Sequence, residues 1–273
     1  MKTALIRQPA GLGDILWMQP LVDDMSRRGF NVIYPVIDHY YDMVTNNIKT
    51  NNSTFMRESD LSGDLLEVYK QTREIIEDDF EYYPFDCIGD PSTESYRPEF
   101  SDFTVMQKKP EYYKLINPEY DYTQVDWRDS VKIIRNYERE RAYEDAVGVV
   151  ENEEFIWANR CYGTPPGVIY RDININNEDI KIIENDNRLT NVFDVCGLLE
   201  KATEIHTVDT CFCYFIELLN VGADLNLYSR RPTEDGLDDI TSKMDRDVYI
   251  AFVNDVFRKT GYSCYKKEWK RHL

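Results

Sequence analysis

A glycine-rich turn that ends in a carboxylate, Gly11-Leu12-Gly13-Asp14, follows the first apolar run of the chain. Glycines let a ligand approach the backbone closely, and a carboxylate within reach of a hydroxyl can act as a general base. The alternative is a tight turn in which Asp14 only caps the following helix. The motif lacks the third glycine of GxGxxG and the lysine of a P-loop, which disfavours ordinary dinucleotide and nucleoside triphosphate sites.

Two loops in the second half of the chain carry groups that suit an anionic ligand. In the first loop, Arg160 could hold a diphosphate through forked hydrogen bonds, or lie exposed beside a rigid Gly-Thr-Pro-Pro turn. The second loop runs from a strand end into a helix, where backbone amides and the Thr210 hydroxyl make a positive pocket. Asp209 as a plain helix cap is the alternative. The residues that we assign to ligand binding here are Asn159, Arg160, Gly163, Thr164, Asp209, Thr210, Cys211 and Phe212.

Three further residues follow predicted strands of the second half. Glu184 could contact the hydroxyls of a ribose, or belong to a plain polar loop. Arg230 and Arg231 could add positive charge, or form a solvated bend. Ligands of open parallel sheets bind beyond the carboxyl ends of the strands, so we expect these loops at one sheet edge.

The elements that position these residues alternate between strands and helices. At the N-terminus we predict a strand over 3–7, a helix over 14–28 that is kinked by Pro20 or begins there, and a strand over 31–36. Such a unit builds parallel sheets. In the second half, a charged helix over 129–147 connects to a series of strands (154–158, 167–171, 180–183, 204–208, 224–228) and helices (191–201, 211–219, 248–258).

Residues 38–126 give a weaker pattern, because short apolar pieces alternate with Asn, Ser, Asp and Pro. We expect strands and long loops there, with the apolar pieces at 55–56, 65–69, 74–76 and 80–84.

Composition limits the class of protein. The chain has 273 residues and a formal charge of -18, which disfavours nonspecific nucleic-acid binding. We find no signal peptide and no apolar window long enough for an integral membrane segment, and the six cysteines form no CxxC pair. We therefore expect reduced thiols and a cytoplasmic location. Richness in Asn, Ile, Asp, Tyr and Lys is typical of an AT-rich bacterial or viral genome, and for a virus the location would be the host cytoplasm.

Two short motifs carry a family resemblance. Residues 11–16 with Pro20-Leu21 resemble the N-terminal signature of glycosyltransferase family 9, the heptosyltransferase-like enzymes. Residues 198–202 and 205–210 resemble that family's helix, strand and Asp-Thr loop at the donor diphosphate. The two motifs cover about 45 residues in the family's order. The sequence departs from the family at Cys211 and Phe212, where a small residue is usual, and at Tyr214, near the place of a His.

The resemblance implies an α/β protein of the GT-B fold, with two Rossmann-like doubly wound domains that face each other across a cleft. It further implies inverting transfer of a sugar from a nucleotide sugar to a glycan acceptor without a metal. Asp14 matches the family's proposed catalytic base, next to the acceptor-side residues Gly11, Leu12 and Gly13. We place an acceptor domain at 1–128, a nucleotide-sugar domain at 129–255, and at 256–273 a helix or tail that could pack back on the first domain.

Other readings remain open. A noncatalytic GT-B-like scaffold that binds a nucleotide or glycan would fit the altered turn, and a nucleotide-sugar epimerase is a third option. Asp245-Arg246-Asp247 formally matches a metal-binding DxD, but its place near the C-terminus argues against that use. Cys211 and Cys213 point to different faces of a helix, which excludes zinc binding by this pair. The oligomeric state, the donor and the acceptor are not determined by these patterns.

Overall fold

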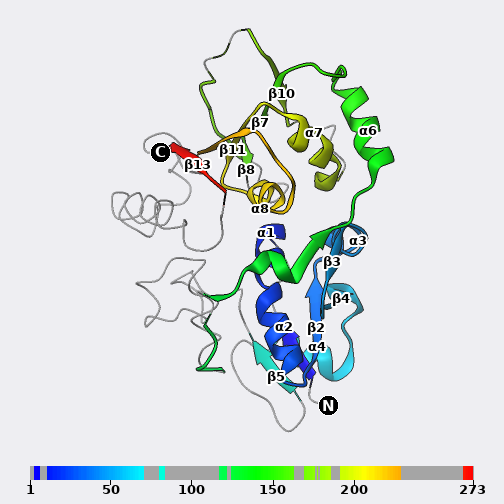
Figure 1. The fold of residues 1–273 in the computed structure, drawn as a ribbon. Coiled ribbons are helices and arrows are strands. Elements are labelled where there is room, and N and C mark those ends of the chain that lie inside the picture. The colour runs from blue at the N-terminus through cyan, green and yellow to red at the C-terminus, as the bar shows by residue number, and fades with distance from the viewer. Residues whose placement is uncertain are drawn as a thin grey trace, which may run out of the picture. The chain divides into compact units, whose positions relative to one another are not determined.

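A computed structural model describes residues 3–6, 11–70, 80–83, 117–121, 124–162, 169–175, 177, 179–185, 191–228 and 267–272. The chain divides into two compact units, Met1–Ile134 and Arg135–Leu273 (Figure 1). Each unit has its own parallel sheet, which confirms the α/β class. Residues 129–134, which we had placed in the second domain, belong to unit 1.

The sheet of unit 1 has four parallel strands in the order β4-β2-β1-β5. They are β1 (Thr3–Ile6), β2 (Asn31–Val36), β4 (Thr54–Arg57) and β5 (Phe80–Tyr83). The first strand-helix-strand prediction is confirmed. Its helix is interrupted at Met18, with α1 (Leu12–Trp17) before the break and α2 (Gln19–Arg27) after it. Pro20 lies in the first turn of α2, where its missing N–H leaves no hydrogen bond unmade.

The remainder of unit 1 differs from the prediction of strands and loops. Its described residues include the helices α3 (Asp38–Asn47) and α4 (Gly63–Lys70), and α4 covers an apolar piece that we had read as a strand or loop. Leu65 and Leu66 of α4 pack against a core cluster that contains Leu5. Beyond them, β3 (Ile48–Thr50) pairs antiparallel with β6 (Val131–Ile133).

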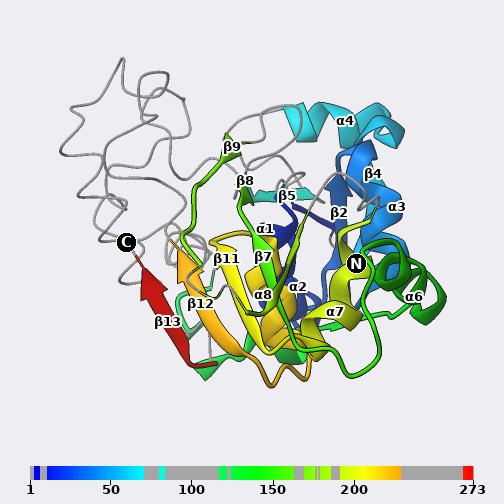
Figure 2. The ribbon, with the colours of Figure 1, turned by 90° about the horizontal axis from the view of Figure 1, so that it is seen from above.

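The sheet of unit 2 has five parallel strands in the order β10-β7-β11-β12-β13. They are β7 (Phe155–Asn159), β10 (Lys181–Glu184), β11 (Glu204–Val208), β12 (Asp224–Tyr228) and β13 (Trp269–His272). Four of these strands follow the predicted ranges closely. In Figure 2, β13 (red) lies along β12 (orange) at the edge of the sheet.

The described part of unit 2 contains the helices α6 (Tyr137–Ala146), α7 (Cys196–Lys201) and α8 (Cys211–Leu218), and a 3-10 turn, η6 (Val192–Val195), leads into α7. The predicted helix over 129–147 is therefore wrong in its first half, where the 3-10 turn η5 (Trp127–Ser130) precedes β6. The predicted strand over 167–171 is reduced to β9 (Ile169–Tyr170). It pairs antiparallel with β8 (Cys161–Tyr162) outside the main sheet.

The core of unit 2 is built by β7 and α8. All five residues of β7 are buried, as are most residues of the apolar helix α8. Phe212 packs edge-on against Trp157 with ring centroids 5.1 Å apart, and Phe215 contacts Phe193 at 4.5 Å. The contact between Phe212 and Trp157 thus holds α8 against β7.

The end of the chain forms a strand of unit 2, not the helix or tail that we had considered for packing on the first domain. The buried carboxylate of Glu217 on α8 accepts hydrogen bonds from the Trp269 indole Nε1 at 2.9 Å and from the Lys267 amide at 3.1 Å. These bonds attach β13 to α8. The strand β13 also pairs with β12 in the sheet. The predicted helix over 248–258 lies outside the described residues.

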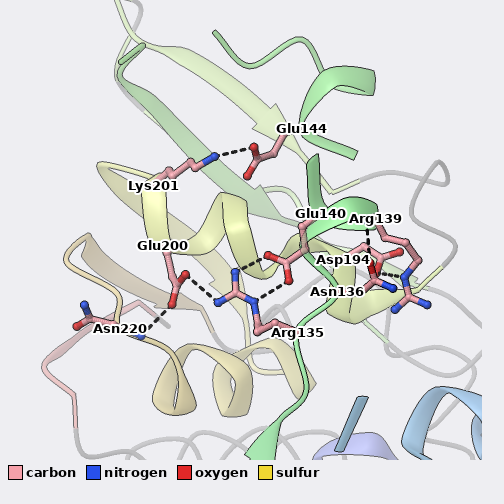
Figure 3. Close-up of polar contacts among 9 residues, drawn as sticks. All are labelled: Arg135, Asn136, Arg139, Glu140, Glu144, Asp194, Glu200, Lys201 and Asn220. Carbon is pink, nitrogen blue, oxygen red and sulfur yellow. Dashed lines mark hydrogen bonds and ion pairs between the residues drawn. The ribbon is translucent and has the colours of Figure 1, made fainter. Parts of the chain in front are cut away.

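A cluster of charged side chains joins α6 to α7 (Figure 3). The Arg135 guanidinium donates to both carboxylate oxygens of Glu140, with Nε to Oε1 at 2.6 Å, and its third nitrogen donates to Glu200 Oε2 at 2.8 Å. Beside it, Arg139 donates to Asp194 at 2.9 Å. Burial raises the pKa of Asp194, an effect that Arg139 opposes. No helix within the described ranges is both long and apolar enough to cross a lipid bilayer.

Candidate functional site

The strand order of unit 2 identifies one position at the edge of its sheet as a candidate site. Numbered by position in the unit, its strands run 2-1-3-4-5, so the order reverses between β7 and β11. Ligands of doubly wound sheets bind at such a reversal, outside the carboxyl ends of the strands. Asn159 ends β7, whereas Asp209 and Thr210 directly follow β11. The structure therefore brings two of the predicted loops to the same point of the sheet.

The turn after β11 presents the start of α8. The Asp209 amide donates to the Tyr228 carbonyl at 3.0 Å, and Thr210 occupies the N-cap position in an extended conformation. The Thr210 side chain makes no capping hydrogen bond to the helix. The first amides of a helix have no partner within it and lie at the positive end of the helix dipole, so this turn suits an anionic oxygen.

The two residues that depart from the family pattern do not fill this turn with side chains. Phe212 is directed into the core against Trp157 and is only 5% exposed, so only its backbone amide can face a ligand. Cys211, the first residue of α8, is partly exposed. The departure from the family pattern at 212 therefore places an aromatic ring in the core of unit 2.

Asn159 has a different position from the one predicted. Its side chain is fully buried, and both ends of the amide are used inside the protein. Nδ2 faces Cys161 O at 3.2 Å, Thr207 Oγ1 at 3.2 Å and Thr210 Oγ1 at 3.4 Å, while Oδ1 accepts from Asn185 Nδ2 at 2.8 Å. Asn159 thus connects the end of β7 to the turn after β11 and to Asn185.

Arg160 and Glu184, predicted separately as a diphosphate clamp and a ribose contact, are paired with each other. Arg160 Nε donates to Glu184 Oε1 at 2.9 Å, and a second nitrogen donates to the Ile173 carbonyl. The Arg160 side chain is only 11% exposed, whereas Glu184 is 44% exposed. Arg160 thus ties the segment after β9 to β10, and Glu184 keeps accessible surface for a polar ligand.

Sequence reasoning missed Arg171 and Tyr228 at this edge. Burial lowers the pKa of Arg171, which lies electrostatically close to Tyr162 and Tyr228. Burial raises the pKa of Tyr228, and the charges of Arg160 and Arg171 oppose that rise. Tyr228 could have been found as the last residue of a predicted strand, because the neighbouring predicted strands end at site residues. The predicted residues Gly163, Thr164, Arg230 and Arg231, and the DxD at 245–247, lie outside the described part of the chain.

Asp14 belongs to unit 1, at the corresponding reversal of that sheet. The order β4-β2-β1-β5 reverses at β1, and Asp14 lies in the first turn of the helix that follows β1. Gly11 occupies the N-cap position with a φ of 81°, and a Cβ built on it would lie 2.4 Å from Asp14 Oδ2. The carboxylate therefore folds back over Gly11. Asp14 is partly exposed, Gly13 likewise, and Leu12 is buried.

Tyr34 lies beneath this turn on β2. Burial raises its pKa well above the ordinary value, and the charge of Asp14 adds to the rise. Among the described residues its hydroxyl has no hydrogen-bond partner. Within the same part of the chain, no group of three His, Cys, Asp or Glu side chains is arranged to hold a metal ion.

No protein-family model matches this sequence, and no curated protein matches it. Three solved structures are similar to nearly the whole chain. E. coli heptosyltransferase WaaC with ADP is 11% identical, covers 97% of this chain and 99% of its own, and has a TM-score of 0.42. E. coli ADP-heptose lps heptosyltransferase II is 12% identical, with coverages of 96% and 100% and a TM-score of 0.45. A glycosyl transferase family 9 structure from Veillonella parvula is 9% identical, with coverages of 96% and 97% and a TM-score of 0.46.

Proposed function

We propose that this protein is a glycosyltransferase that moves a sugar from a nucleotide-diphosphate sugar to a glycan hydroxyl. The observation that carries the proposal is the start of α8 directly after β11, at the strand-order reversal of a parallel sheet, where Thr210 is partly exposed and its side chain does not cap the helix. Such a position suits the diphosphate of a nucleotide. The resemblance of residues 198–210 to a donor-diphosphate loop, and of residues 11–16 to an acceptor-side signature, supports the same activity.

The proposed reaction is a single displacement with inversion. The acceptor oxygen bonds to the anomeric carbon while the bond from that carbon to the diphosphate oxygen breaks, and the acceptor proton passes to Asp14. The amides of residues 210–212 and the Thr210 hydroxyl would stabilise the negative charge that develops on the departing nucleoside diphosphate. This assignment requires no metal, and Glu184 retains its predicted role toward the ribose.

Asp14→Asn tests the assignment of the base. We expect turnover, measured as nucleoside diphosphate release from nucleotide sugars with glycan acceptors and EDTA, to fall about 100-fold or more. Nucleotide affinity, measured by calorimetry, should stay unchanged. Asp64→Asn is the matched control, because Asp64 also lies in the first turn of a helix, α4, and is exposed.

Four results would contradict the proposal in different ways. If the Asp14 and Asp64 variants turned over equally, Asp14 would not be the base. If the wild-type protein bound nucleotide without any transfer or release, the noncatalytic scaffold would replace the enzyme. If transfer needed a divalent cation, metal independence would be wrong, and binding of no nucleotide at all would remove the transferase reading entirely.

A further inference from the structure

We propose that Asn159 orients the Thr210 hydroxyl so that it donates a hydrogen bond to the diphosphate of the bound nucleotide. Asn159 is then a positioning residue, which acts on a ligand that it never touches. This inference rests on the proposed function and assigns a directional role within the same site. Its evidence is the pattern of donors and acceptors around one buried amide.

The orientation of the Asn159 amide follows from its neighbours. The carbonyl oxygen of Cys161 can only accept, so the group 3.2 Å from it must be the NH2 of Asn159. At the other end, Asn185 donates its own NH2 to Asn159 Oδ1 at 2.8 Å. A flipped amide would place two acceptors together at one end and two donors at the other. The NH2 of Asn159 therefore faces both threonines.

The two threonine hydroxyls use that NH2 differently. Thr207 donates its own proton to the Val208 carbonyl at 2.9 Å and presents its oxygen to Asn159 at 3.2 Å. Thr210 also presents its oxygen to Asn159, at 3.4 Å. An amide NH2 cannot accept a proton, so the Thr210 proton must point elsewhere.

Nothing in the described part of the protein takes up the Thr210 proton. The hydroxyl does not cap α8, and Thr210 is partly exposed, in contrast to the fully buried Thr207. A hydroxyl that accepts on its inner side and has its proton on its outer side is a donor suited to an anionic oxygen. It would act beside the first amides of α8, which are donors of the same kind.

The chain offers a matched pair of variants for the test. Thr210→Val and Thr207→Val remove the same hydroxyl, and each removes one contact of Asn159. The probe is whichever of ADP, GDP, UDP and CDP the wild-type protein binds in calorimetry with EDTA. We expect Thr210→Val to weaken its binding about tenfold or more, as for a hydrogen bond to a charged group. We expect Thr207→Val to lower the melting temperature without changing the affinity.

A double-mutant cycle distinguishes positioning from a general structural effect. In Asn159→Asp the carboxylate accepts, so it draws the Thr210 proton inward and removes the donor. We expect this variant to weaken binding as much as Thr210→Val does, and the double variant to be no weaker than either one. Asn159→Ala takes its place in the cycle if the buried carboxylate prevents folding, which circular dichroism will show.

Full additivity of the two losses, or wild-type affinity in the Thr210→Val protein, would overturn the inference while the proposed function stands. Equal losses of affinity in the Thr207 and Thr210 variants would also overturn it. Binding of none of the four diphosphates by the wild-type protein would remove the proposed function, and the inference with it.

Discussion

Gly11 is required for space as well as for its backbone conformation. Its φ of 81° is in the left-handed region, and an added Cβ would lie 2.4 Å from Asp14 Oδ2 and 3.3 Å from Asp14 Cγ. Gly29, which ends the helical segment before β2, has a similar φ of 90° but no atom within 4 Å of an added Cβ. Substitutions at these two glycines can therefore be compared to separate the effect of backbone strain from the effect of displacing the Asp14 carboxylate.

We predict that Gly11→Ala and Gly29→Ala both reduce stability by about 1 kcal/mol, because each forces an L-residue into the left-handed region. Only Gly11→Ala should reduce turnover as well, because Asp14 has to move away from the new methyl group. Thermal unfolding and nucleoside diphosphate release measure the two effects. Equal turnover in both variants would mean that the placement of Asp14 over Gly11 does not matter for the reaction.

His272 is the residue whose titration bears most directly on β13. Its ring stacks on Tyr228 with centroids 4.4 Å apart, and its Nε2 lies 3.1 Å from Asn226 Oδ1. Burial lowers the pKa of His272, and the neighbouring His206 and Lys270 lower it further. The folded protein therefore favours the neutral imidazole more than the unfolded chain does.

The stability that His272 contributes should be fully present above its unfolded pKa of about 6.5 and should be lost as the pH falls through its lowered folded pKa. We predict that His272→Phe, which keeps an aromatic ring on Tyr228, flattens the decline of unfolding free energy between about pH 7 and pH 5. His39→Phe, at an exposed position of α3, should leave that decline unchanged. Identical pH profiles for wild type and His272→Phe would contradict the prediction.

At the scale of elements, the attachment of α6 to α7 depends on Arg135. The carboxylate that it pairs with, Glu140, is only 3% exposed. The hydrogen bonds that Arg135 donates to Glu140 and Glu200 raise its pKa further above its already high value. By contrast, Lys201 pairs with Glu144 across the same two helices with 54% of its side chain exposed.

We predict that Arg135→Met costs about 3–5 kcal/mol of unfolding free energy, because it leaves Glu140 buried without a counter-charge. Lys201→Met should cost at most about 1 kcal/mol. Adding Glu140→Leu to Arg135→Met should recover part of the loss, since no isolated charge then remains. Urea unfolding measures all three values, and equal costs for the two single variants would contradict the prediction.

The elements that could be predicted from sequence are those with strong apolar patterns. The strands β7, β11 and β12 and the helix α8 are runs of apolar residues bounded by polar turns, and they lie close to the predicted ranges. By contrast, α3 buries only Val44 and Asn47, so the sequence has no apolar periodicity that would predict this helix. In β13 only Lys270 is exposed and the other three residues are partly buried, and its sequence, Trp-Lys-Arg-His, shows no such pattern.

The candidate site was predictable to the same extent. Residues at strand ends, such as Thr210, could be located because a parallel sheet collects those ends at one edge. The burial of Asn159 and the pairing of Arg160 with Glu184 could not, because they depend on β7 lying between β10 and β11. Strand order is a long-range property that local spacing does not encode.

At the scale of the whole molecule, the two residues at the boundary between the units, Ile134 and Arg135, are each held within their own unit. The Ile134 amide donates to the Asn47 carbonyl at 2.8 Å, within unit 1. The next residue, Arg135, is held within unit 2 by Glu140 and Glu200, and its side chain is only 14% exposed. Next to the join, Ile134 is therefore held within unit 1 by its backbone amide, and Arg135 is held within unit 2 by its side chain.

We expect a protease to cut slowly at this join. Trypsin needs an arginine side chain that can enter its specificity pocket and a backbone that can leave its hydrogen bonds, and proteolytic nicking concentrates where neither is constrained. We predict that limited trypsin digestion of the native protein does not cut after Arg135 early, and that Arg135→Lys, whose ammonium cannot reproduce the forked pairing, makes the cut faster. A first fragment ending at Arg135 in the wild-type protein would contradict this. Fragment maps from native digestion would then report the exposed segments of the chain and pass over the boundary between its two units.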